Sequence, residues 1–149
     1  MEDSQSIAAE ALREVPLLSG LMSADLSRIA RIGKRKRYAA GEPIVTKGTF
    51  GGGLFLVVSG TANVDVGGKI HALGPGEFFG EMSLISTKPR SATVTAAESV
   101  DVLIIHAVDF KAFLMANPSL AVVLLERMAE RLREVQDRID TGGQLPGAG

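Results

Sequence analysis

The sequence predicts an α+β domain in which an antiparallel β-roll, a jelly-roll-like barrel, is flanked by N-terminal helices and a long C-terminal helix. Three observations predict this fold. Twelve of the 17 glycines fall between Gly33 and Gly80, where short apolar segments alternate with turn residues. Apolar residues recur at helical spacing before this region and again after it. The length of 149 residues suits one domain with a real hydrophobic core.

The first 33 residues are predicted to be helical. Their apolar residues recur at helical spacing until Pro16 ends the pattern: Ile7, Ala8, Ala11, Leu12 and Val15. A second helix should follow, with Ser23 as its N-cap and Gly33 as its C-terminal cap residue.

From residue 34 to residue 106 the pattern changes to short strands with glycine-rich turns. Leu54–Ser59 is a continuous apolar run and therefore a buried strand, whereas 62–66 alternates between apolar and polar residues, as a half-buried strand does. Gly67 and Gly68 predict a tight hairpin turn between 62–66 and Lys69–Leu73. The last two predicted strands are Ser91–Ala96 and Val100–His106.

The C-terminal third is predicted to return to helix. A short helix should run from about Asp109 to Met115, and Asn117 should cap a long helix that begins at Pro118. The long helix has one apolar stripe: Leu120, Leu124, Met128, Leu132, Val135 and Ile139. The expected organisation is an N-terminal helical segment at 1–33, a β-roll at 34–106, C-terminal helices at 107–140 and a disordered tail at 141–149.

Composition excludes several function classes. Sixteen basic residues against 17 acidic ones leave a net charge of −1, which lacks the basic footprint of a nucleic-acid-binding protein. The longest apolar run has six residues, 120–125, so no membrane span is expected. The acidic, amphipathic N-terminus does not resemble a signal peptide, and we expect a cytoplasmic protein. The absence of cysteine excludes disulfides, thiolate metal sites and thiol nucleophiles.

The segment 74–96, GPGEFFGEMSLISTKPRSATVTA, carries the most chemical information. It places Glu81 directly after Gly80 and nine residues before Arg90. A glycine allows close approach of a ligand to the backbone, and the free N–H groups of a helix that opens at Glu81 favour an anion. The guanidinium of Arg90 can bind two phosphate oxygens, while the carboxylate can accept hydrogen bonds from hydroxyl groups. This combination points to a nucleotide.

The order of elements and five motifs resemble the cyclic nucleotide-binding domain. This family is the regulatory module of catabolite-activator-type regulators, cyclic-nucleotide-dependent kinases and cyclic-nucleotide-gated channels. The matching motifs are PLLSGLMSADLSRIA, AGEPI, LFLVVSGTANV, FGEMSL…PRSATV and DFKAFLMANPSL. The fourth is the most specific, because it resembles the phosphate-binding cassette of the family, which here corresponds to residues 74–96.

The resemblance implies a non-enzymatic regulatory domain whose ligand is cyclic AMP more than cyclic GMP, with no other cofactor. It assigns Glu81 to the ribose 2′-hydroxyl, Arg90 to the exocyclic phosphate oxygens and Ser91 to phosphate or base. Backbone N–H groups near Met82 and Ser83 should face the phosphate. The ligand-binding set implied in this way is Phe79, Gly80, Glu81, Met82, Ser83, Arg90, Ser91 and Ala92.

The family also implies that the C-terminal helix transmits the signal by rearranging over the base. Arg131, Leu132 and Val135 occupy the positions expected for this lid. The second half of the helix suits a lid and a coiled-coil seam equally, so a homodimer through this helix is a candidate assembly, and the sequence does not identify the effector domain or partner. One departure is the loop GTFGGG, residues 48–53: Thr49 stands where the family often has an acid, and three consecutive glycines predict mobility.

Three alternative interpretations remain open. Glu81 and Arg90 could form an internal ion pair with no ligand. A cupin-like metalloenzyme has a similar barrel, although His71 and His106 are the only histidines and do not form a metal-binding motif. The domain could also be a ligand-free scaffold with this fold. The basic run GKRKRY, residues 33–38, is interpreted as a charged, solvent-exposed strand.

Overall fold

A computed structural model describes residues 4–86 and 88–141, and it confirms the α+β β-roll. The predicted tail lies outside the described residues from residue 142 onward. The helices are α1 (Ser4–Leu12), the 3₁₀ helix η1 (Pro16–Leu18), α2 (Ser23–Ile32), the 3₁₀ helix η2 (Glu81–Leu84), α3 (Ala107–Ala116) and α4 (Pro118–Asp140). The strands are β1 (Lys34–Tyr38), β2 (Pro43–Val45), β3 (Gly53–Ser59), β4 (Ala62–Val66), β5 (Lys69–Leu73), β6 (Phe78–Phe79), β7 (Thr93–Ala96) and β8 (Val100–His106).

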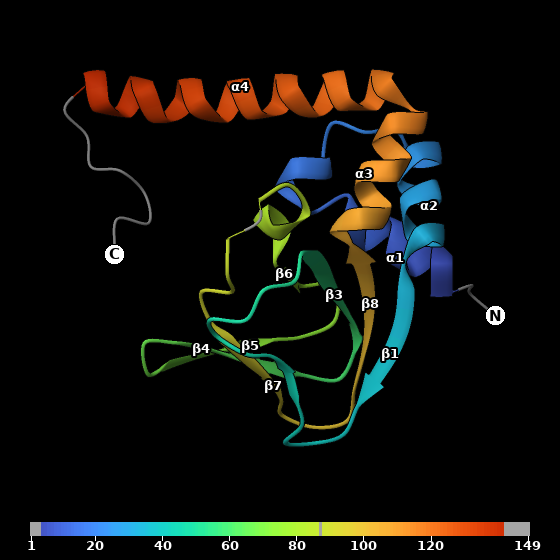
Figure 1. The fold of residues 1–149 in the computed structure, drawn as a ribbon, viewed down its shortest axis with the longest axis vertical. Coiled ribbons are helices and arrows are strands. Elements are labelled where there is room, and N and C mark those ends of the chain that lie inside the picture. Colours follow the sequence, from blue (N-terminus) through green and yellow to red (C-terminus); the bar gives the residue numbers. More distant parts are fainter. Residues whose placement is uncertain (1–3, 87, 142–149) are drawn as a thin grey trace.

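Two four-stranded antiparallel sheets form the roll, in the strand orders β1-β8-β3-β6 and β2-β7-β4-β5. Figure 1 shows the helices gathered at one end of the roll, with α4 lying across that end. The helices therefore close one end of the roll, and η2 lies between the roll and α4.

Strand β3 is buried on both faces and joins two hydrophobic cores. Leu54 and Leu56 belong to the cluster that contains Phe110 and the apolar side chains of α1 and α2. Phe55 and Val57 point the other way, into the cluster that fills the roll. This is why the run 54–58 lacks the apolar–polar alternation of β4.

The helix caps differ from the sequence-based expectations. The N-cap of α2 is Met22, and Ser23 is the first helical residue, with its hydroxyl 2.6 Å from a guanidinium nitrogen of Arg13. The side-chain amide of Asn117 donates to the carbonyl of Phe113 (2.9 Å), so it closes the end of α3 instead of capping α4. The sequence therefore predicted the positions of these helix ends to within one residue. It did not predict the hydrogen bonds that Ser23 and Asn117 form.

Gly33 does follow α2, and its conformation is extended (φ −72°, ψ 156°) rather than left-handed. A Cβ at this position would lie 2.7 Å from Cδ1 of Leu103. Any larger residue here would have to displace the side chain of Leu103, so the glycine allows α2 to lie close to β8.

Among residues 4–86 and 88–141, no single helix has the length and hydropathy of a membrane span. The helices α3 and α4 together have that length and hydropathy, but they are bent by 114° relative to each other.

Candidate functional site

Gly80 sets the backbone conformation of the candidate site. Its φ of 83° lies in the left-handed region that favours glycine, and η2 begins at the next residue, as predicted. A Cβ on Gly80 would lie 2.5 Å from the carbonyl oxygen of Gly53 and 2.7 Å from a guanidinium nitrogen of Arg90. The two segments 48–53 and 79–84 can approach each other only because glycine occupies this position.

One expectation about η2 is wrong. The N–H group of Ser83, which was expected to face a phosphate, donates to the carbonyl of Gly80 at 2.9 Å. In a 3₁₀ helix the N–H of the third residue already donates to the carbonyl three residues earlier, whereas in an α-helix the third N–H is still free. The start of η2 therefore offers fewer free N–H groups to an anion than the start of an α-helix would.

Arg90 is held by neutral groups. Its guanidinium donates to the hydroxyl of Ser83 (3.0 Å) and to the carbonyl of Gly53 (3.2 Å), and it lies over the ring of Phe55 at 5.4 Å. Its backbone N–H also donates to the carbonyl of Thr49 (2.8 Å), which ties the cassette to the loop 48–53. Burial lowers the pKa of Arg90 from its usual value.

No carboxylate of the described residues pairs with the Arg90 guanidinium. The positive charge is therefore half-buried without a compensating negative charge, an arrangement that favours an anionic ligand.

Glu81 bonds to segments far away in the sequence. One carboxylate oxygen accepts from the backbone N–H of Leu17 in η1 (2.8 Å), and the other accepts from the guanidinium of Arg131 in α4 (3.2 Å). Its side chain is only 11% exposed. An internal ion pair between Glu81 and Arg90 is absent from the described residues, so that alternative is wrong.

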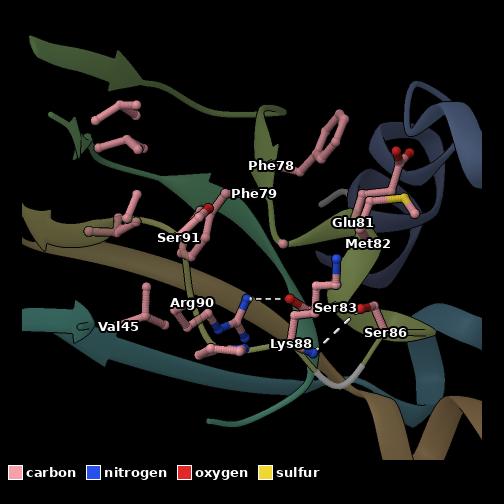
Figure 2. A pocket seen from close by; sticks show the side chains of 16 residues that line it. Val45, Phe78, Phe79, Glu81, Met82, Ser83, Ser86, Lys88, Arg90 and Ser91 are labelled. Atoms are coloured by element: carbon pink, nitrogen blue, oxygen red, sulfur yellow. Dashed lines mark hydrogen bonds between the residues drawn. The ribbon is translucent and has the colours of Figure 1, made fainter. Parts of the chain in front are cut away.

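A pocket of about 510 Å³ lies against the cassette. Such a volume is within the usual range for small-molecule sites. Figure 2 shows Arg90 and Ser83 joined by a hydrogen bond on one wall, with Phe79 and Ser91 nearby. All eight residues of the implied ligand-binding set line it: Phe79, Gly80, Glu81, Met82, Ser83, Arg90, Ser91 and Ala92.

The pocket also has a wall that the sequence analysis did not assign to the site. Val64 and Val66 of β4, Val45 of β2 and Val94 of β7 provide apolar surface for a flat ring. The alternation of β4 could have identified Val64 and Val66, because residues two apart share one face of a strand. Phe78, Ser86, Lys88 and Pro89 complete the lining.

The three proposed lid residues do not line this pocket. Arg131 reaches the site only through Glu81. Leu132 is 69% exposed and Val135 is 37% exposed, so both have apolar surface to bury. The helix α4 thus contacts the carboxylate of Glu81 through Arg131, but it does not cover the pocket.

The glycine loop is less free than its sequence predicts. A Cβ on Gly52 would lie 2.7 Å from the Cβ of Ala107 and 2.7 Å from the carbonyl oxygen of Ser83. Gly53 is equally confined, because its Cβ would lie 2.9 Å from the carbonyl of Ile105. These two glycines position η2 and Arg90, whereas Gly48 and Gly51 have open space around them. The sequence analysis did not assign Gly52 and Gly53 to the site.

Among residues 4–86 and 88–141, no three histidine, cysteine, aspartate or glutamate side chains are close enough to share a metal ion.

Comparison with known proteins shows the family of the chain. The family model described as the cyclic nucleotide-binding domain matches residues 35–117. A cyclic nucleotide-gated potassium channel of Rhizobium etli is 41% identical over 117 residues, which cover 78% of this chain and 33% of the channel. The cyclic AMP receptor protein of Thermus thermophilus is 35% identical over 131 residues, which cover 84% of this chain and 61% of that protein. The chain thus spans about a third of the channel and less than two thirds of the receptor protein.

A solved structure gives the same result for the fold. The N-terminal domain of a transcriptional regulator from Streptomyces coelicolor A3(2) superposes with a TM-score of 0.76 at 29% identity, over 85% of this chain and 92% of that domain.

Proposed function

Since the chain belongs to the cyclic nucleotide-binding domain family, we propose that the 510 Å³ pocket binds a cyclic nucleotide, cyclic AMP in preference to cyclic GMP, and that α4 reports its occupancy. The observation that carries this proposal is Arg90, a half-buried cation that bonds only neutral oxygens in the described residues. A group held in this way costs folding free energy that only an anionic ligand returns.

Each part of a cyclic nucleotide has a matching group in the pocket. The cyclic phosphate carries one negative charge, and the guanidinium of Arg90 donates hydrogen bonds to its exocyclic oxygens. The 2′-hydroxyl of ribose donates to the carboxylate of Glu81. The purine lies against the apolar wall formed by Val64 and Val66, and the hydroxyl of Ser91 is available to phosphate or base.

The preference for cyclic AMP is supported by the relatives. One is named cyclic AMP receptor protein, and another, 38% identical over 106 residues, is named as the regulatory subunit of a cAMP-dependent protein kinase of Aspergillus fumigatus. In the pocket, a guanine 2-amino group would need an acceptor. Ser91 is a candidate, whereas Ser83 already accepts from Arg90 and Glu81 already accepts from two donors.

The bond between Glu81 and Arg131 supports coupling between the pocket and α4. A ribose hydroxyl that donates to Glu81 competes with Arg131 for the same carboxylate. Release of Arg131 frees the second half of α4 to bring Leu132 and Val135 over the base. Ligand binding then shifts the population of α4 positions, because the nucleotide binds the covered state more tightly.

The exposed stripe of α4 is also suited to pairing with a second copy of the chain. Leu132, Val135 and Ile139 are all exposed on this helix. We propose a non-enzymatic domain whose output depends on a partner domain or on this self-association. Size-exclusion chromatography with and without nucleotide distinguishes a lid from a dimer seam.

Titration calorimetry with cyclic AMP and cyclic GMP tests the function. A one-to-one complex with cyclic AMP, tighter than that with cyclic GMP, supports the proposal. Failure to bind either nucleotide would favour a ligand-free scaffold. One bound metal ion per chain in elemental analysis would favour the cupin-like metalloenzyme, which no observation on the described residues supports.

A further inference from the structure

Three charged side chains line the pocket: Glu81, Lys88 and Arg90. The negatively charged one, Glu81, already has partners within the protein. Both carboxylate oxygens of Glu81 accept hydrogen bonds, and Arg131 compensates its charge. Arg90 bonds only neutral oxygens. The pocket therefore offers an anionic ligand the uncompensated charge of Arg90 and, beside it, the charge of Lys88.

Lys88 has no ion pair among the described residues. Its backbone N–H lies 3.4 Å from the hydroxyl oxygen of Ser86, and its side chain is exposed and lines the cavity. Figure 2 shows Lys88 in the same part of the pocket as Ser83 and Ser86. Pro89 follows, and a residue before proline is confined to an extended backbone, which limits the directions that the lysine side chain can take. Lys88 is thus a second cation beside the pocket.

A cyclic nucleotide uses only one of these two charges, because a cyclic phosphodiester carries a single negative charge. A phosphomonoester carries nearly two above its second pKa of about 6. We propose that Lys88 is a second phosphate-binding cation, which extends the ligands of this pocket to nucleotides whose phosphate carries two negative charges. This inference rests on the proposed function, since it uses the same phosphate site.

The role of Lys88 has a signature that a solvated surface lysine lacks. Coulomb energy is proportional to the charge of the ligand, so loss of the lysine must cost a dianion twice the free energy that it costs a monoanion. It must cost an uncharged ligand nothing. A lysine that only keeps the cassette folded would affect all three ligands equally.

The test measures three ligands by calorimetry at pH 8: the neutral methyl triester of cyclic AMP, cyclic AMP itself, and 5′-AMP as the dianion. Lys88→Gln is compared with the parent. Lys111→Gln is the control, because Lys111 is an exposed lysine on α3 that lines none of these walls. Lys88→Arg keeps the charge, and thermal unfolding verifies that every variant is folded.

Lys88→Gln should weaken cyclic AMP by about two- to fivefold, the range of a solvent-accessible ion pair. It should weaken the binding of 5′-AMP by the square of that factor, about four- to twenty-five-fold, and leave the affinity for the triester unchanged. Lys88→Arg should behave like the parent, and Lys111→Gln should change nothing.

The inference is overturned, and the proposed function left intact, if cyclic AMP binding is the same in Lys88→Gln as in the parent or if all three ligands lose equal affinity. A parent protein that binds cyclic AMP but shows no binding of 5′-AMP at millimolar concentration also overturns it. If the parent binds neither nucleotide, the proposed function fails and this inference fails with it.

Discussion

Replacement of Arg90 by methionine separates ligand binding from stability. Methionine keeps an apolar stem against the ring of Phe55 and removes the charge. The truncation of one partner of a desolvated charge pair costs about 2–5 kcal/mol of binding free energy. Arg90→Met should therefore weaken cyclic AMP binding by about 30-fold to several thousand-fold.

The stability of the ligand-free protein should change little. Arg90 donates two hydrogen bonds to neutral oxygens, each worth about 1.5–3 kcal/mol of net stability because the donor is charged. Against this loss, the substitution removes a cation whose burial is unfavourable, as its lowered pKa shows. The opposing terms nearly cancel, so we expect a change within about 1 kcal/mol, or roughly 2–4 °C in the unfolding midpoint of a chain this long.

Calorimetry and thermal unfolding, each with and without cyclic AMP, give the two readouts. At a ligand concentration of about 100 times the parent's Kd, the parent should gain about 2.7 kcal/mol of stability, whereas the variant should gain about 0.9 kcal/mol after a roughly 30-fold loss of affinity and almost none after a loss of several thousand-fold. Binding by Arg90→Met that equals parent binding would place the phosphate elsewhere. A variant destabilised by several kcal/mol would show that Arg90 is a structural residue, and the reasoning from its uncompensated charge would be refuted.

Three further substitutions test separate parts of the site. Glu81→Gln should weaken cyclic AMP about ten- to hundredfold and bring the affinity ratio of cyclic AMP to its 2′-deoxy analogue towards one in calorimetry, because a hydrogen bond to a charged group is lost; an unchanged ratio would move the ribose elsewhere. Arg131→Ala should change stability by less than about 1 kcal/mol, yet make hydrogen exchange in the second half of α4 insensitive to nucleotide; retained sensitivity would exclude this residue as the coupling. Gly52→Ala should destabilise the fold by about 1–3 kcal/mol in thermal unfolding, since its Cβ would lie 2.7 Å from the carbonyl of Ser83, whereas Gly74→Ala has 3.7 Å to its nearest neighbour and should unfold like the parent.

The sequence predicted what local chemistry determines. Strand β4 and the turn at Gly67 and Gly68 have patterns of two to five residues, and the structure forms both, with positive φ at each glycine. The helix that the sequence predicts from Glu81 likewise begins at that residue, directly after Gly80. The eight residues of the implied ligand set lie within 14 positions of one another, so a correct local fold brings them to one pocket.

The sequence did not predict what depends on long-range contacts. The partners of Glu81 are Leu17 and Arg131, which are 64 and 50 residues away, and no local pattern identifies them. Asn117 shows the same limit at shorter range. Its side chain has a choice between the start of α4 and the end of α3, and the 114° bend between these helices places it against Phe113. Sequence patterns indicate candidate hydrogen-bond donors and acceptors, but the tertiary structure determines which of them form bonds with each other.

In the proposed mechanism, a nucleotide moves α4 by breaking the contact of Glu81 with Arg131 and by attracting apolar side chains of the helix to the base. An ion pair with this exposure is worth about 0.2–1 kcal/mol, whereas a shift of a two-state equilibrium from 1:99 to 99:1 needs about 5.5 kcal/mol. Competition for the carboxylate therefore supplies only a small part of a complete switch. Burial of Leu132 and Val135 over the base supplies a larger part than the ion pair does. Full burial of an exposed side chain is worth about 1.5–3 kcal/mol, and these two side chains are 69% and 37% exposed, so about 1.6–3.2 kcal/mol in total remains to be gained. The proposed mechanism therefore assigns release of the helix to Arg131 and stabilisation of its closed position to the apolar contact with the base.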